Sequence, residues 1–183
     1  MAACRSTSEW KTPRLRRCLV SPAKKPPLSR DPPLTTLPPM DATELPSTVH
    51  EAIQHFCADG DELAAAGRYE EAVGIYNRAW EMVPEPKNRW HASTWILAAI
   101  ADAAFLANYR TSAKEALEYA MVCPDAVGNP FLHLRLGQVL LDMGDPDRAA
   151  DELMRAYMGA GAELFATEDQ RYLGFLRTRA ALD

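Results

Sequence analysis

Apolar residues recur every three or four positions along most of the chain that follows its proline-rich first quarter. The clearest example is the stretch 60–84, where Ala72, Tyr76 and Ala79 fall on one face of a helix. Because Ala72 and Ala79 lie two turns apart, a facing helix can approach closely only while both side chains stay small. With Gly67 as the turn residue, the stretch predicts two antiparallel helices joined by a tight turn.

Capping signals place the remaining helices. Thr48 and Glu51 have the spacing of a capping box at the start of the first helix, and Thr167 and Gln170 repeat it before the last one. Two Asx-Pro pairs, at 129–130 and 145–146, predict two further helix starts. The predicted helices cover about 48–66, 69–83, 90–109, 111–122, 129–144, a segment from 145 to the glycines at 159 and 161, and 168–182.

The third pair of helices repeats the first. Four small residues of the first pair recur at a constant displacement of 77 residues. The two sets are Gly60, Gly67, Ala72, Ala79 and Gly137, Gly144, Ala149, Ala156. The middle pair keeps the same intervals at Ala113, Leu117 and Ala120, but it lacks a turn glycine at Ala107 and needs a shift of one residue. We therefore expect an all-α fold of three helical hairpins, over about 53–86, 93–125 and 130–163, with a last helix covering the third.

The segment from Trp90 to Tyr109 is apolar enough for a membrane span to be considered. Its one formal charge, Asp102, would cost about 2.5–3.5 kcal/mol in the hydrocarbon core. A helix covered by protein on both sides explains the same pattern without that cost, so we expect no membrane association.

Composition divides the chain in two. Residues 1–46 hold nine of the fourteen prolines. Residues 1–45 carry a net charge of +4, whereas residues 46–183 carry a net charge of −9. We expect residues 1–45 to be a disordered, basic leader and residues 46–183 to form one folded domain. An organelle transit peptide and a natural start at Met40 are two interpretations of the leader. An acidic domain favours a basic protein partner and disfavours nucleic acid.

No catalytic, metal or cofactor site is predicted. Cys57 and Cys123 fall among apolar helical positions, where a thiol packs as a small core side chain. Cys4 and Cys18 lie in the leader, and the four cysteines form no CxxC pair. This usage fits the reducing cytoplasm. His50 and His55 are five residues apart and do not share a helix face.

The first hairpin resembles the tetratricopeptide repeat, which has a period of about 34 residues. The resemblance rests on Phe56, Gly60, Gly67, Tyr69, Ala72, Tyr76, Ala79 and Pro84. The third hairpin departs from it at Pro146 and Gly161. The resemblance implies three hairpins stacked as a short right-handed solenoid, with a C-terminal capping helix and a concave groove lined by the first helix of each hairpin.

That groove is the expected binding site, for a protein or peptide partner. Its predicted lining is Gln54, Asp61, Thr94, Leu97, Phe105, Leu134, Gln138, Leu141 and Asp142. The expected function is non-catalytic protein binding, through the groove or the acidic surface. An assembly scaffold or co-chaperone-like adaptor is the alternative, although Cys57 and Asp61 stand where a clamp for an acidic chaperone tail needs basic or amide side chains. An enzyme of unrecognised type is the remaining one.

A second resemblance concerns residues 123–176. The segments NPFLHLRLGQ and AYMGAGAELF are similar to parts of small bacterial tetratricopeptide proteins encoded beside polymorphic toxins. It implies a role as an immunity or accessory protein.

Overall fold

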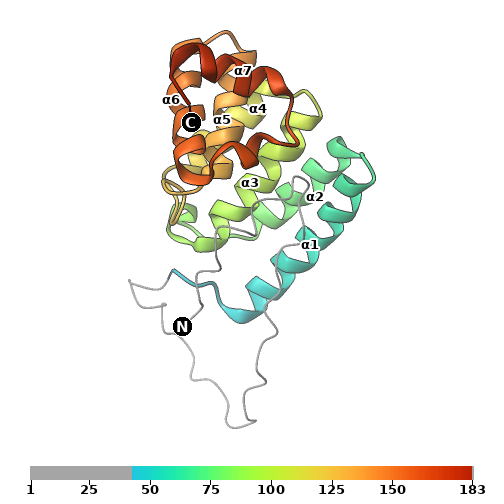
Figure 1. Cartoon of the computed structure of the whole chain (residues 1–183). Coiled ribbons are helices and arrows are strands. Elements are labelled where there is room, and N and C mark those ends of the chain that lie inside the picture. The colour runs from blue at the N-terminus through green and yellow to red at the C-terminus, as the bar shows by residue number, and fades with distance from the viewer. Residues whose placement is uncertain (1–42, 183) are drawn as a thin grey trace, which may run out of the picture.

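The computed structural model describes residues 43–182, and every regular element in that part of the chain is helical (Figure 1). The α-helices are α1 (Ser47–Ala65), α2 (Tyr69–Glu81), α3 (His91–Leu106), α4 (Arg110–Ala120), α5 (Pro130–Asp142), α6 (Pro146–Ala160) and α7 (Gln170–Arg179). Two 3-10 helices not expected from the sequence are η2 (Lys87–Arg89) and η3 (Ala162–Phe165). The predicted all-α class is confirmed. The predictions about the leader, Met40, Cys4 and Cys18 concern residues outside the described part.

The helices pack in chain order. Each of α1 to α6 contacts the next helix, so that α1–α2, α3–α4 and α5–α6 form three hairpins in a row. Contacts also join α1 to α3 and α3 to α5. Figure 1 shows the first hairpin at one end of the domain, and α6 and α7 at the other.

The three hairpin turns share one backbone conformation. Gly67, Asn108 and Gly144 have φ values of 74°, 69° and 81°, in the left-handed region that ends a helix. The turn residue of the middle hairpin is therefore Asn108, and the expected counterpart at Ala107 is wrong by one position. Asparagine adopts this conformation more readily than other residues with a Cβ. When Asn108 is aligned with Gly67 and Gly144, equivalent residues of the first and second hairpins are 41 positions apart, and those of the second and third are 36 apart. No shift within a hairpin is then needed.

Small residues let the two helices of a hairpin approach closely. A Cβ on Gly60 would run into the ring of Tyr76, and one on Gly137 would lie 2.7 Å from Cγ of Leu153. The corresponding position of the middle hairpin is Ala101, which is fully buried. The prediction that small residues set the helix spacing agrees with this packing.

The predicted caps are correct at two helices and wrong at two. The side chains of Asn129 and Asp145 accept hydrogen bonds from the amides of Phe131 and Arg148, as expected. The helix α1 instead begins after Pro46 without a side-chain cap, so the box at Thr48 does not form. At α7, Asp169 rather than Thr167 caps the helix.

The apolar segment considered as a membrane span is the central helix of the stack. Thirteen of the sixteen residues of α3 are buried. Among residues 43–182, no helix combines the length and apolar character needed to cross a membrane. Cys57 and Cys123 are buried core residues, as predicted.

Glycine-to-alanine substitutions test this packing. Gly137→Ala should lower the free energy of unfolding by about 1–3 kcal/mol, because the added methyl group overlaps the side chain and approaches the backbone of Leu153. Gly74→Ala in α2 meets open space and should raise it by about 0.5–1 kcal/mol through helix propensity. Urea unfolding of both variants measures the two effects. Equal shifts in the two variants would show that the α5–α6 contact is not close packed.

Candidate binding face

The constant displacements between hairpins identify equivalent positions on α1, α3 and α5. Together these positions form a face that we call the α1/α3/α5 face. Its three rows of residues are Gln54, Trp95, Phe131; Asp61, Asp102, Gln138; and Ala64, Phe105, Leu141.

Two predicted groove residues of the middle hairpin are out of register with this face. The hydroxyl of Thr94 donates to the carbonyl of Pro124, 2.5 Å away in the loop after α4, and Leu97 is a core residue. The equivalent positions are Trp95 and Ala98. The error has the same source as the missed turn at Asn108, because both follow from aligning the middle hairpin one residue early.

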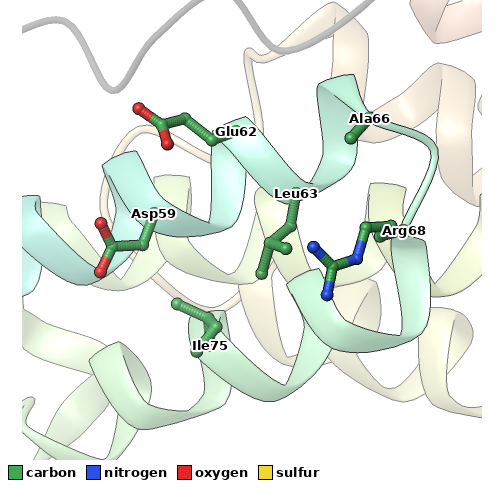
Figure 2. Close-up of a pocket in the computed structure, with 6 residues that line it drawn as sticks. All are labelled: Asp59, Glu62, Leu63, Ala66, Arg68 and Ile75. Atoms are coloured by element: carbon green, nitrogen blue, oxygen red, sulfur yellow. The ribbon is translucent and has the colours of Figure 1, made fainter.

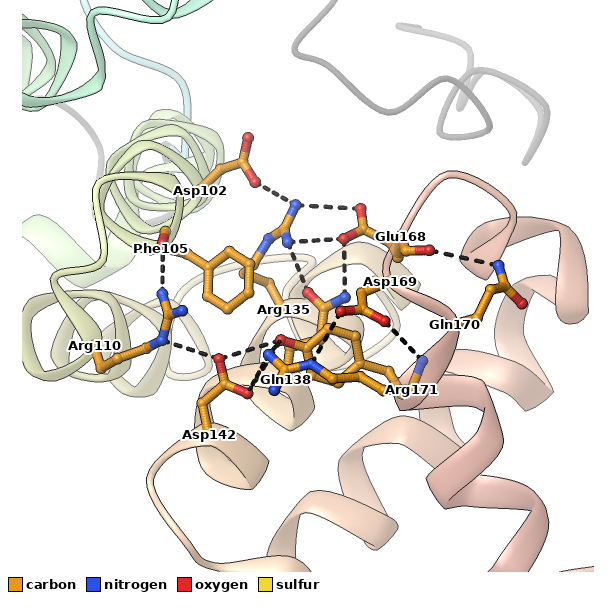
Figure 3. A network of polar contacts seen from close by, with 11 residues as sticks. Asp102, Phe105, Arg110, Arg135, Gln138, Asp142, Glu168, Asp169, Gln170 and Arg171 are labelled. Atoms are coloured by element: carbon orange, nitrogen blue, oxygen red, sulfur yellow. Dashed lines mark hydrogen bonds and ion pairs between the residues drawn. The ribbon is translucent and has the colours of Figure 1, made fainter.

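A buried ionic cluster occupies the part of the face that α5 contributes (Figure 3). The guanidinium of Arg135 lies between two carboxylates, with Nη2 2.5 Å from Asp102 Oδ1 and Nη1 3.1 Å from Glu168 Oε2. Gln138 accepts a hydrogen bond from Arg135 and donates one to Glu168, at 2.7 and 2.9 Å. Two predicted groove residues, Gln138 and Phe105, contact Arg135 in this cluster, and a third, Leu134, is a buried core residue. Arg135 and Glu168 were not predicted.

Aromatic rings complete the surroundings of Arg135. Its guanidinium lies 4.5 Å from the ring centre of Phe105 and 5.4 Å from that of Phe131. Cation–π attraction at a buried guanidinium stabilises it by about 2 kcal/mol, and the planar group can also stack on a ring. Residues from α3, α5 and the segment before α7 therefore meet around one side chain.

A second polar group holds α7 to the end of α5. Asp142, another predicted groove residue, lies 3.0 Å from Arg110 Nε and 2.8 Å from Arg171 Nη2. It also accepts a hydrogen bond from the hydroxyl of Tyr172 at 3.1 Å. Burial and the nearby Asp142 raise the pKa of Tyr172 to about 12.

The segment carrying η3 and α7 stays attached mainly through its apolar side chains. The buried ones are Leu164, Phe165, Tyr172, Leu173 and Leu176. Burying five such side chains contributes on the order of 10 kcal/mol before the entropy of ordering is subtracted. The α5 part of the face is therefore occupied by the chain itself.

The part of the face on α1 and the first half of α3 remains open. Gln54, Asp61 and Trp95 are all partly exposed there. Nε2 of His50 lies 2.8 Å from Nε2 of Gln54, and the rings of His50 and Trp95 meet edge to face at 6.5 Å. Asp61 accepts a hydrogen bond from Tyr76, 2.7 Å away on α2. This open half offers an aromatic surface, an amide and a carboxylate.

Negative charge is in excess where the open and occupied halves meet. Asp102 and Glu168 face Arg135 alone, and Asp102 is only 3% exposed. Burial raises the pKa of the Asp102 carboxyl above its usual value, and the charge of Glu168 adds to this, while Arg135 opposes it. Oδ1 of Asp102 pairs with Nη2 of Arg135, whereas Nε of Arg135 has no hydrogen-bond partner among the described residues.

Two further acidic residues of the first hairpin, Asp59 and Glu62, are exposed and take no part in the cluster around Arg135. Figure 2 shows Asp59 and Glu62 on α1, beside a shallow depression floored by Leu63 and Ile75. The equivalent residues of the later hairpins are apolar and buried: Ile100, Ala103, Leu136 and Val139. Arg68, at the edge of the depression, pairs with Glu71. The two acidic residues therefore give the end of the stack a polar surface.

The histidines near the third hairpin have structural contacts. The ring nitrogens of His133 lie 2.6 Å from a carboxylate oxygen of Glu152 and 2.7 Å from the carbonyl oxygen of Val127. His91 pairs with Asp125. Within residues 43–182, no three His, Cys, Asp or Glu side chains are grouped as metal ligands would be.

Comparison with known proteins does not assign the chain to a family. No protein-family model matches the chain, and no curated protein matches it.

The charge imbalance at Asp102 predicts a pH dependence. Because the pKa of Asp102 is higher in the folded chain than in the unfolded one, its contribution to stability is largest at low pH and decreases as pH rises through the folded pKa. Asp102→Asn cannot titrate. We expect the stability of the wild type to fall relative to that of Asp102→Asn as the pH rises above the usual carboxyl pKa of about 4.

Urea unfolding at a series of pH values measures this difference. Asp59→Asn removes an exposed carboxylate and serves as the control. A constant difference between wild type and Asp102→Asn across the series would contradict the raised pKa.

Proposed function

We propose that the three hairpins form a short right-handed solenoid of tetratricopeptide type, with the α1/α3/α5 face as its concave side and α7 as its cap. Support comes from the repeated left-handed turn at Gly67, Asn108 and Gly144, and from the equivalent close-packed positions. The contacts of α1 with α3 and of α3 with α5 also agree with this arrangement.

The proposed function is non-catalytic binding of a protein partner on the open half of this face. The observation that supports it is how the chain's own segment before α7 occupies the α5 half of the face. The non-helical residues leading to α7 place Glu168 against Arg135 and Gln138, whose side chains bind it through two carboxylate oxygens. The face thus already receives an irregular segment through side-chain contacts, which is how such surfaces bind peptides.

The open half favours a basic segment with an apolar residue. Asp61 supplies a partly exposed carboxylate, and no Lys or Arg lies between Ser47 and Ala65. Trp95 offers a ring on which an aliphatic or guanidinium group can pack. A partner of this chemistry agrees with the net charge of −9 over residues 46–183.

Two kinds of partner fit this surface. A basic bacterial toxin is one, and it rests on the resemblance of residues 123–176 to toxin-associated tetratricopeptide proteins. A set of proteins brought together by an assembly scaffold or adaptor is the other. The first requires a tight complex with one partner at fixed stoichiometry, and the second requires several weaker partners.

Affinity capture with matched variants tests the proposal. The full chain is used as bait in wild-type form, as Asp61→Lys and as Glu115→Lys, and retained proteins are identified by mass spectrometry. Both substitutions change the charge equally, but Glu115 lies exposed on α4, outside the face. For a recovered protein we expect about a tenfold loss of affinity, about 1.4 kcal/mol, for Asp61→Lys only.

Circular dichroism of both variants checks that the helices remain. Equal loss in the two variants would show that binding depends on overall charge and not on this face. Equal retention in both would place the binding site elsewhere.

A further inference from the structure

We infer that the loop between α4 and α5, residues 121–129, is attached in a pH-dependent way: a doubly protonated His133 holds it, and loss of one proton releases it at Val127. The inference goes beyond the proposed function and does not depend on it. It concerns the junction of the second and third hairpins, where this loop leads into the first residue of α5.

Both ring nitrogens of His133 face hydrogen-bond acceptors. Nδ1 lies 2.6 Å from Oε2 of Glu152 on α6, and Nε2 lies 2.7 Å from the carbonyl oxygen of Val127 in the loop. A neutral imidazole carries one N–H, so it can donate to only one of these two acceptors. The other contact would then set two acceptors against each other at hydrogen-bond distance. The geometry therefore requires a proton on each ring nitrogen.

The surroundings of the ring favour this state. His133 is only 7% exposed, and the side chain of Glu152 is largely buried beside it. The hydrogen bond to Glu152 raises the pKa of His133 above its usual value, and the contact with Val127 adds to this, while burial and the charge of Arg155 oppose it. The additional proton resides on the ring and not on Glu152, because a carboxylate is much less basic than an imidazole.

Two arginines of α6 lie near Glu152 but pair with other acids. Arg155 pairs with Asp151 at 3.0 Å, and Arg148 pairs with Glu118 at 3.0 Å. Their charges act on Glu152 only at longer range. The cation at hydrogen-bond distance from Glu152 is therefore the imidazolium of the buried histidine.

A second histidine contacts the same loop. Nδ1 of His91, the first residue of α3, lies 2.8 Å from Oδ2 of Asp125. Asp125 has a φ of 60°, in the left-handed region that residues with a Cβ adopt at an energetic cost, so its conformation depends on such contacts. The hydroxyl of Thr94, which does not titrate in this range, donates to the carbonyl of Pro124. The part of the loop that depends on histidine is therefore 125–129.

Loss of one proton should release the side of the His133 ring that faces Val127. The remaining N–H stays with the carboxylate of Glu152, because a hydrogen bond to a charged acceptor is stronger than one to a carbonyl. Nε2 then presents a lone pair to the carbonyl oxygen of Val127. Because the folded pKa of His133 is raised, the contact stabilises the fold fully below the unfolded pKa of about 6.5 and is lost as pH rises through the folded pKa.

Heteronuclear NMR of the full chain tests both steps. We expect both ring nitrogens of His133 to carry a proton at about pH 7, and the ring to titrate above the ordinary histidine pKa of about 6.5. The amide of Asn129, which donates to the carbonyl of Ala126 at 2.9 Å, reports on the loop. The amide of Tyr109, which donates to the carbonyl of Ala104 at 2.8 Å in the middle turn, is the internal reference.

The ratio of the two exchange rates removes the general effect of pH on amide exchange. As the His133 ring loses its proton, we expect exchange at Asn129 to rise by about threefold to tenfold relative to Tyr109, which corresponds to the loss of about one hydrogen bond.

Glu152→Gln separates the charge of the ring from its contacts. A glutamine amide can donate to Nδ1 of a neutral His133 while Nε2–H still donates to Val127, so the loop should stay attached at every pH. We expect this variant to lower the pKa of His133 and to abolish the change in exchange ratio. Glu115→Gln, which removes an exposed carboxylate on α4, is the matched control and should change neither.

Two results would overturn the inference. One is a His133 ring that titrates at or below a pKa of about 6.5. The other is an exchange ratio that stays constant while the ring titrates, or that changes equally in the wild type and in Glu152→Gln. Both are read from the isolated chain, so neither bears on the capture of a partner.

Discussion

Close approach of paired helices is the constraint on which the rest of the structure depends. At Gly60 and Gly137 no Cβ can be accommodated without moving Tyr76 or Leu153, and Ala101 takes the same place in the middle hairpin. The residues directly after these positions, Asp61, Asp102 and Gln138, are equivalent positions of the α1/α3/α5 face. Contacts of α1 with α3 and of α3 with α5 bring the three helices together.

The use made of that face differs between its two halves. Near α5, the polar side chains of Arg135, Gln138 and Asp142 serve the attachment of the chain's own C-terminal segment. Apolar burial supplies most of the energy of that attachment, while the ionic contacts select its position, since a buried ion pair stabilises little once desolvation is subtracted. On α1 and the first half of α3, the corresponding side chains Gln54, Asp61 and Trp95 are partly exposed.

Negative charge also serves two purposes in this domain. On the outer side of the first hairpin, Asp59 and Glu62 replace residues that are apolar and buried in the later hairpins, and they keep the end of the stack soluble. On the α1/α3/α5 face, Asp61 is partly exposed, whereas Asp102 is 3% exposed and pairs with Arg135. The total of −9 therefore overstates the charge that a partner would meet.

The helices, their order and their close contacts could be predicted from the sequence alone, because helical periodicity, Asx-Pro caps and small residues act over a few positions. The turn at Asn108 was not predicted because a left-handed φ was expected only at a glycine. The resulting one-residue error assigned Thr94 and Leu97 to the groove in place of Trp95 and Ala98. The contact of Glu168 with Arg135, 33 residues away, depends on the tertiary fold, and so does the choice of which half of the face remains open. A charge pair between a loop and a helix leaves no periodic signal, since its partners are brought together by the folding of everything between them.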